Sequence, residues 1–179
     1  MRLIGGHLKR SKLPVADHPG LRPTPDRVRE TLFNWLGQDL TGWRVLDAFA
    51  GSGALGFEAA SRGAAEVLLL DADAMLVRSL QASQARLKVQ ALRVEQADAL
   101  AWMARCAPAR FDLVLLDPPF GAGLQAAALA AAAPLLGPGG LLYLESPAAF
   151  TTTELPADLA LLRQGRAGAV HYHLLRRST

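Results

Sequence analysis

The chain has 179 residues, 51% of them hydrophobic, and a formal net charge of +3. This length is typical of a single domain that buries about 70% of its unfolded surface, so we expect a core that needs no disulfide. The one cysteine, Cys106, excludes an internal disulfide framework and is expected to be a small buried apolar residue. We find no apolar signal segment and no run of about 20 apolar residues, which predicts a soluble, cytoplasmic protein without a membrane partner.

The basic excess lies at the two ends of the chain. Residues 1–44 carry a net charge of +4 and residues 151–179 a net charge of +2, on either side of a middle with a net charge of −3. The first 16 residues contain four basic side chains and no acid. We therefore expect Lys9 and Arg10 to contact a polyanion, with an ordinary solvated terminus as the alternative.

The first elements are predicted from glycine, proline and capping residues. Residues 1–23 form a basic N-terminal arm, expected to be a loop or short hairpin that is mobile without a partner. A helix is predicted over residues 24–37, because Thr24 can cap it, Pro25 suits its first position and Gly37 ends it. Its expected buried face consists of Val28, Leu32, Trp35 and Leu36.

From residue 44 onward the pattern alternates between strands and helices. The strands are predicted at residues 44–48, 66–70, 91–94, 111–116 and 140–144, and the helices at 54–62, 73–87, 100–105 and 124–136. Two further strands, at 159–163 and 169–176, read as a closing hairpin joined across Gly165 and Gly168. This order predicts an α/β, Rossmann-like fold over 1–179: a mostly parallel seven-stranded sheet, helices on both faces and a C-terminal antiparallel hairpin.

A glycine-rich turn runs from Asp47 to Gly56, between the first predicted strand and the next helix. Gly51 and Gly53 allow a tight turn and close approach to a ligand, and Gly56 allows the helix to pack on the strand. An acid at the strand end would repel a pyrophosphate, and the absence of Gly-Lys-Ser/Thr excludes a P-loop. We therefore predict a cofactor with a positive amino group and a sulfonium, S-adenosylmethionine, over a merely structural turn. The other residues of this turn expected to contact the cofactor are Phe49, Ala50 and Ser52.

Acidic residues also follow the next two predicted strands. Asp71 lies where a doubly wound fold places an acid that accepts hydrogen bonds from ribose hydroxyls. Asp73 is the competing candidate, although it could simply cap the following helix. Asp98 could accept from the adenine amino group, cap a helix, or do both.

The sequence Asp117-Pro118-Pro119-Phe120 follows the strand predicted at 111–116. The prolines end the strand, so a carboxylate, a rigid corner and an aromatic ring lie together at its carboxyl end. Asp117 and the Pro118 carbonyl can accept from an exocyclic base amine and direct its lone pair at a methyl group. Phe120 can stack on the base, which must be unpaired or flipped out of a helix. A proline-stiffened turn with a capping acid is the structural alternative.

Together, the glycine turn and this corner resemble the amino-methyltransferases of nucleic acids. RLIGG at 2–6 and LRPTPDRVRETLFNWL at 21–36 narrow the resemblance to the RsmD family, and GAVHY at 168–172 resembles that family's last strand. The resemblance implies S-adenosylmethionine-dependent methylation of the N2 amine of one guanine in 16S ribosomal RNA. The second-strand acid is often Glu in such enzymes, and Asp71 has a shorter reach.

The resemblance also implies further contacts and partners. Arg22, Thr24 and Arg27 would contact the RNA backbone or close over the cofactor, with a solvated helix start as the alternative. The partner would be 16S rRNA within a small-subunit assembly particle, and the protein a monomer that holds no metal. Two other functions stay open: DNA adenine-N6 methylation, which uses the same corner, and a non-catalytic RNA-binding assembly factor.

Overall fold

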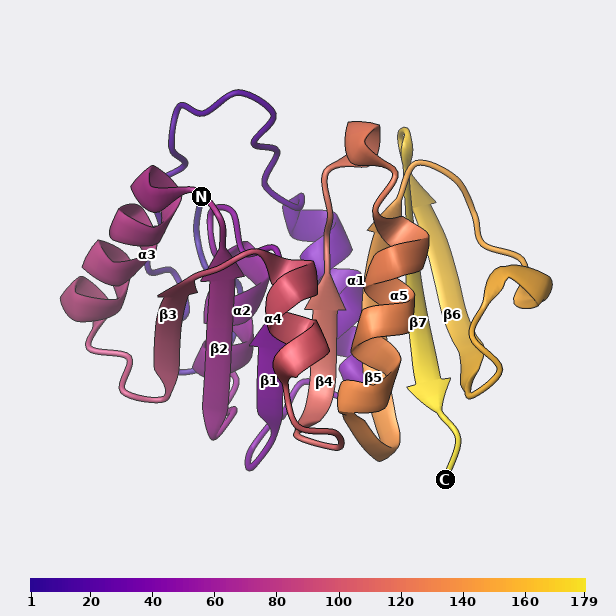
Figure 1. Cartoon of the computed structure of the whole chain (residues 1–179). Coiled ribbons are helices and arrows are strands. Elements are labelled where there is room, and N and C mark those ends of the chain that lie inside the picture. Colours follow the sequence, from indigo (N-terminus) through magenta and orange to yellow (C-terminus); the bar gives the residue numbers. More distant parts are fainter. The chain divides into compact units, whose positions relative to one another are not determined.

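The computed structural model describes all of residues 1–179 and divides them into two compact units, Met1–Ala99 and Leu100–Thr179 (Figure 1). The elements of the first unit are α1 (Asp26–Leu36), β1 (Arg44–Asp47), α2 (Ala54–Ser61), β2 (Glu66–Asp71), α3 (Ala74–Leu87) and β3 (Leu92–Gln96). The remaining elements are α4 (Ala99–Arg105), β4 (Phe111–Leu116), η1 (Phe120–Ala122), α5 (Gln125–Ala132), η2 (Ala133–Leu135), β5 (Leu136–Ser146), η3 (Thr152–Glu154), β6 (Leu159–Ala167) and β7 (Val170–Arg177).

Seven strands make up the sheet in the order β3-β2-β1-β4-β5-β7-β6. In the first unit β2 pairs in parallel with both β1 and β3. In the second, β4 pairs in parallel with β5, whereas β7 is antiparallel to both β5 and β6. The prediction of a mostly parallel, seven-stranded sheet with a C-terminal antiparallel hairpin is confirmed. The prediction of a single domain stays a prediction.

Strands β1, β2 and β4 are almost continuously buried, as their apolar runs predicted. Val67, Leu69 and Leu70 of β2 are 0% exposed, and so are the last four residues of β4. Parallel strands covered on both faces need apolar side chains at every position rather than at alternate ones. Asp71 ends β2 and Asp117 follows β4, so each strand positions a carboxylate at its carboxyl end.

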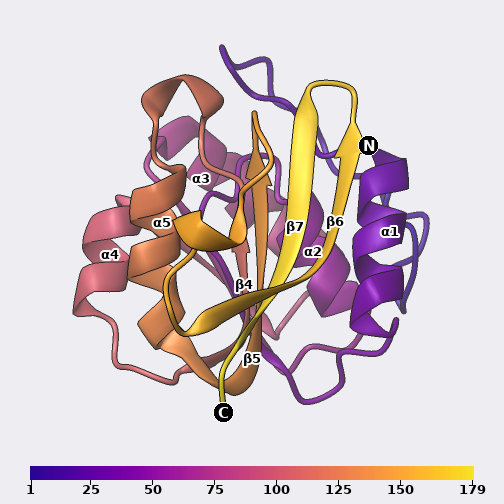
Figure 2. The same cartoon turned by 90° about the vertical axis from the view of Figure 1, so that its right-hand side faces the viewer.

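Two predicted elements of the second unit have different ends in the structure. The helix predicted at 124–136 stops at Ala132, because Pro134 has no N–H to continue it; a 3-10 turn follows, and Leu136 already opens β5. The last hairpin was expected to turn across Gly165 and Gly168. Figure 2 shows β6 and β7 as long neighbouring strands, and Gly165 lies inside β6, paired with Tyr172.

Helix α1 ends as predicted but begins differently. Gly37 takes a left-handed conformation, with φ of 92°, and its N–H donates to Asn34 O. The N-cap is Pro25 rather than Thr24, and no side chain caps the helix. The predicted buried face is also incomplete, since Trp35 is only half-buried. Phe33 and Arg29, neither of them in the predicted face, are both 0% exposed.

The N-terminal arm is paired and anchored rather than free. Residues 1–13, here called the N-terminal hairpin, are joined by an antiparallel bridge between Arg2 and Lys12 and by Leu3 N donating to Ser11 O at 2.9 Å. Leu3 is 2% exposed. Residues 14–23, here called the strap, form the indigo loop that rises above the start of α3 in Figure 1. The expected short hairpin is therefore present and anchored by buried Leu3 and Leu13, whereas the mobility of the arm stays a prediction.

Two other sequence expectations concern single features. Cys106 is half-buried rather than fully buried, and its thiol lies 3.4 Å from Ala107 O. None of the helices combines the length and apolar character required to cross a bilayer.

Candidate functional site

The glycine turn is held at the end of β2 by the carboxylate of Asp71. Asp71 Oδ2 accepts from Gly51 N at 2.9 Å, and its Oδ1 accepts from Asp73 N at 2.9 Å. A third bond, from Ala50 N to Leu70 O at 2.8 Å, fixes the same turn. Each carboxylate oxygen retains a further lone pair, so Asp71 can order this turn and still accept from a ligand hydroxyl.

Asp47 is more enclosed than its position suggested. It is 2% exposed, and its Oδ2 accepts from Gly56 N at 3.0 Å, in the first turn of α2. A Cβ at Gly56 would lie 2.0 Å from Leu69 Cδ2 and 3.1 Å from Asp47 Oδ2. Only glycine permits this approach of α2 to β1 and β2. The position of Asp47 at a strand end suggested a carboxylate open to a cation. In the structure this carboxylate already stabilises the start of α2.

Apart from Phe49, the other residues of the turn before α2 have small side chains or none. Gly51 and Gly53 both have positive φ, 56° and 83°, which an L side chain rarely adopts. Gly51, Ser52 and Phe49 are half-buried, whereas Ala50 is 8% exposed. The turn thus offers a ligand the half-buried edge formed by Phe49, Gly51 and Ser52.

Asp73 caps α3, which was the alternative to a contact with the ribose. Its Oδ1 accepts from Met75 N at 2.8 Å and Leu76 N at 3.1 Å, the first free amides of α3. Its Oδ2 lies 2.8 Å from His18 Nε2 of the strap. Asp98 is exposed, just before α4. Asp71 keeps the position of ribose acceptor as a prediction.

The strap crosses the glycine turn within the first unit. Besides the bond from His18 to Asp73, Leu21 Cδ1 lies 3.0 Å from the position that a Cβ on Gly51 would occupy. The hydrogen bond from Leu21 N to His18 O, at 3.1 Å, makes these residues a compact turn. No local pattern indicated this contact of His18 and Leu21 with the turn, because a lone histidine in a proline-rich loop carries no signal.

In the second unit, Asp117 follows β4 directly and is half-buried. Pro118 is buried, Pro119 is exposed with φ of −56°, and Phe120 begins the 3-10 helix η1 and is half-buried. The prolines hold φ near −65° without donating an N–H, so the chain leaves the strand in a fixed direction. The carboxylate, the corner and the ring are therefore held close together, as the sequence predicted.

A buried polar pair on β5 was not predicted. Tyr143 Oη donates to Glu145 Oε1 at 2.8 Å, and the two residues are 0% and 4% exposed. Burial raises the pKa of the Tyr143 hydroxyl well above 10.0, and the charges of Glu145 and Asp117 act in the same direction. Tyr143 therefore stays protonated and donates near the carboxylate of Asp117. The only sequence signal was a glutamate in an otherwise apolar strand.

The predicted RNA-binding side chains differ in their exposure. Lys9, Arg10, Arg22 and Arg27 are exposed, whereas Thr24 is 5% exposed. The four cations all belong to the first unit, in the N-terminal hairpin, the strap and the first turn of α1. Their contacts with RNA stay predictions.

The histidines form no candidate metal site, and the contacts of His173 are structural. No group of three or more His, Cys, Asp or Glu side chains could hold a metal ion. His173 is 1% exposed, with Nδ1 3.1 Å from Leu144 O and Nε2 accepting from Phe150 N at 3.2 Å. Burial lowers the pKa of His173 below 6.5, so the neutral ring makes both bonds and anchors the segment after β5.

Known proteins resemble this chain over nearly its whole length. The family model described as "Conserved hypothetical protein 95" matches residues 1–176. "Ribosomal RNA small subunit methyltransferase D" of Escherichia coli K12 is 42% identical over 179 aligned residues, which cover 99% of this chain and 90% of the relative. The protein of the same name from Haemophilus influenzae is 38% identical, with coverage of 97% and 92%.

A solved structure agrees with these relatives. "Putative methyltransferase yhhF" from Escherichia coli superimposes with a TM-score of 0.88 at 41% identity, over 99% of this chain and 98% of that one. Both the sequence and the fold are thus similar to those of methyltransferases along the entire chain.

Proposed function

The chain belongs to the RsmD family of ribosomal RNA small subunit methyltransferases, and we propose that it transfers a methyl group from S-adenosylmethionine to the exocyclic N2 amine of a guanine in 16S ribosomal RNA. The observation that carries this proposal is the Asp-Pro-Pro-Phe corner directly after β4, in a chain that matches RNA methyltransferases from end to end. The corner supplies the hydrogen-bond acceptors that methylation of an exocyclic amine requires.

The glycine turn is the candidate site for S-adenosylmethionine, and its residues fit that cofactor. The positive φ of Gly51 and Gly53 leaves backbone where side chains would otherwise project. The turn contains no Lys or Arg, so acids rather than cations surround a cofactor that is itself positively charged. Asp71 would accept from its ribose hydroxyls and Asp98 from its adenine amine. When bound, the cofactor supplies an electrophilic methyl group on a sulfonium.

The corner would prepare the acceptor amine. The lone pair of a guanine N2 amine is delocalised into the ring, so the amine is a poor nucleophile until its nitrogen becomes pyramidal. Asp117 and the Pro118 carbonyl accept its two N–H groups and direct the lone pair out of the ring plane. Asp117 or solvent takes the proton released after transfer. Tyr143 donates to Glu145 on β5 and stays protonated.

Phe120 would hold the base in place by stacking, which contributes about 1–3 kcal/mol per base. The base must be unpaired or turned out of its helix to reach the corner.

The direct test compares single-turnover methyl transfer by the wild type and Asp117→Ala on 16S rRNA. Loss of one preorganised acceptor is expected to reduce the rate about 100- to 1000-fold.

Two controls separate chemistry from folding. Calorimetry with S-adenosylhomocysteine should show equal binding by the wild type and Asp117→Ala, and the exposed Glu95→Ala should methylate normally. Equal transfer rates in wild type and Asp117→Ala would remove Asp117 from the mechanism. The substrate class is tested in parallel with naked 16S rRNA, a partly assembled small subunit and duplex DNA. Transfer to DNA alone would favour adenine methylation, and failure to bind the cofactor would favour an assembly factor.

A further inference from the structure

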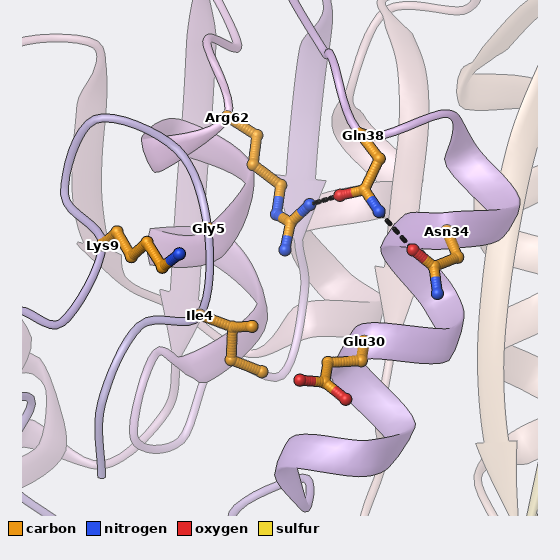
Figure 3. Close-up of a pocket in the computed structure, with 7 residues that line it drawn as sticks. All are labelled: Ile4, Gly5, Lys9, Glu30, Asn34, Gln38 and Arg62. Carbon is orange, nitrogen blue, oxygen red and sulfur yellow. Dashed lines mark hydrogen bonds between the residues drawn. The ribbon is translucent and has the colours of Figure 1, made fainter.

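The first unit contains a groove away from the glycine turn, between the N-terminal hairpin, α1 and the end of α2. It has a volume of about 300 Å³ and is lined by Ile4, Gly5, Lys9, Glu30, Asn34, Gln38 and Arg62 (Figure 3). Three stretches that are distant in sequence therefore build it. None of the catalytic or cofactor-binding candidates lines it.

Arg62 is the fixed cation of this groove. It is 8% exposed, its guanidinium lies 4.7 Å from the centre of the Phe33 ring, and its Nη1 donates to Gln38 Oε1. A Cβ on Gly5 would lie 2.7 Å from Arg62 Nη2, so glycine at this position lets the hairpin backbone press against the guanidinium. The buried Nε of Arg62 has no hydrogen-bond partner. Because Nε is enclosed, an anion in the groove would contact the outer nitrogens of the guanidinium, of which Nη1 already donates to Gln38.

The nearest acid does not satisfy Arg62. Glu58, 0% exposed, accepts from Ile4 N at 2.9 Å and Gly5 N at 3.2 Å, and lies 3.4 Å from Arg29 Nη1. Its Oε2 is 3.6 Å from Arg62 Nε, beyond hydrogen-bond distance. Glu58 therefore anchors the hairpin and forms ion pairs with both Arg29 and Arg62, and because it makes no hydrogen bond to Arg62 it leaves donors of that guanidinium unused.

The opening of the groove has one further cation and one acid. Figure 3 shows the Lys9 ammonium turned toward the space beside Arg62, and the Glu30 carboxylate facing the same space from α1. Both side chains belong to exposed residues, and neither has an ion-pair partner. Two cations suit a phosphate, and an adjacent carboxylate suits a hydroxyl donor. A ribose phosphate of RNA carries both groups, whereas DNA lacks the 2′-hydroxyl.

We propose that this groove binds one ribose-phosphate unit of the RNA substrate, with Arg62 and Lys9 on the phosphate and Glu30 accepting from the 2′-hydroxyl. This proposal rests on the proposed function and explains its substrate class, because a contact with the 2′-hydroxyl makes the protein select RNA over DNA. Helix α2, from its N-cap Gly53 in the glycine turn to its C-cap Arg62 beside the groove, spans about 13.5 Å by the helical rise.

The test measures fluorescence anisotropy with a single-stranded oligonucleotide of 16S sequence and its DNA counterpart, between about 50 and 200 mM salt. Lys9→Gln and Arg62→Gln are each expected to bring the salt slope closer to zero by about 0.7, the single-strand value per phosphate contact. The wild type should bind RNA about fivefold more tightly than DNA, the effect of one ordinary hydrogen bond. Glu30→Ala should abolish that preference, and Glu30→Gln, which keeps an acceptor oxygen, should largely retain it.

The matched control is Arg93→Gln, an exposed cation on β3 whose replacement should leave the slope unchanged. If Arg62→Gln fails to fold, the surface variants Lys9→Gln and Glu30→Ala decide the result. Unchanged slopes in these variants, or an RNA preference that survives Glu30→Ala, would overturn the groove as a ribose-phosphate site. Methyl transfer is assayed separately. Variant effects on binding without any transfer by the wild type would reject only the proposed function, and transfer without those effects would reject only the groove.

Discussion

His18 illustrates how a single residue can tie the strap to the start of α3. Its Nε2 lies 2.8 Å from Asp73 Oδ2 and its Nδ1 lies 2.9 Å from Pro19 O, so the doubly protonated ring satisfies both acceptors. The hydrogen bond to Asp73 raises the pKa of His18 above 6.5, against the opposite effect of partial burial. The same bond is the largest cause that lowers the pKa of Asp73 below 3.8.

The signs of these shifts set a pH window for the strap. A raised histidine pKa stabilises the folded state fully below the unfolded value of 6.5 and loses that effect as the pH rises through the folded value. We expect Asp73→Asn to lower the pKa of His18, since asparagine still caps α3 but carries no charge. Nuclear magnetic resonance of the ring protons measures this directly, with Asp17→Asn as the control. An unchanged pKa in Asp73→Asn would show that the ion pair does not form in solution.

Gly56 decides how closely α2 approaches the sheet. A methyl group there would meet Leu69 Cδ2 at 2.0 Å, inside any normal contact, and would crowd the carboxylate of Asp47. Gly56→Ala is expected to reduce the free energy of unfolding by about 1–3 kcal/mol through overpacking. Urea titration measures it against Gly121→Ala, where a Cβ meets nothing within 4 Å. Equal stability of the two variants would contradict this packing argument.

Among the elements, the N-terminal hairpin, α1 and α2 are joined by one buried charge cluster. Arg29 of α1 donates to Arg2 O at 3.1 Å and to Thr24 O at 3.2 Å, and it also pairs with Asp26 and Glu58. Ser61 Oγ, at the end of α2, accepts from Leu8 N at 2.9 Å. The hairpin is thus held mainly by polar bonds to helices rather than by strand pairing.

Arg29→Ala should therefore destabilise the first unit more than an ordinary surface change. It leaves the carboxylate of Glu58 buried with fewer partners, and breaking such a buried pair costs about 3–5 kcal/mol. Arg27→Ala, an exposed position on the same helix, is expected to change stability by less than about 0.5 kcal/mol. Urea unfolding compares the two variants. A loss below about 1 kcal/mol for Arg29→Ala would mean that water enters and solvates Glu58.

At the scale of the whole molecule, the distribution of charge matters more than its sum. The net charge is only +3, yet the exposed cations Arg2, Lys9, Arg10 and Lys12 are all presented by the short N-terminal hairpin. A folded hairpin holds these charges close together, which a free tail would not. This concentrates positive potential where an RNA backbone can be bound.

If about three of these cations meet phosphates, binding of single-stranded RNA should show a salt slope of roughly −2. Replacing Lys9, Arg10 and Lys12 together by glutamine should then remove this contribution and leave a slope of about −0.7 from the phosphate contact proposed for Arg62. The matched control replaces three exposed cations of β6 and β7, Arg163, Arg166 and Arg176. A flat salt response of the wild type would show that the hairpin takes no part in RNA binding.

The order of elements and both candidate motifs could be predicted because their signals are local. An apolar run, a glycine turn after it, and two prolines after an acid each act within a few residues. That is why the predicted strands and the position of Asp117 after β4 agree with the structure. The ends of elements were less predictable. After Pro134, for example, Leu136 begins β5 instead of ending the predicted helix.

Charged residues that pair over long distances carried no such signal. Arg29 and Glu58 are 29 residues apart, and His18 and Asp73 are 55 apart, so neither pair forms a pattern along the chain. Their burial and partners follow from how the hairpin, strap and helices pack. Local sequence patterns thus predicted the sheet and the functional residues at the ends of its strands. Packing alone settled which charges are buried, which carboxylates are already engaged, and that a groove beside Arg62 exists, since these depend on distances in space that no local pattern encodes.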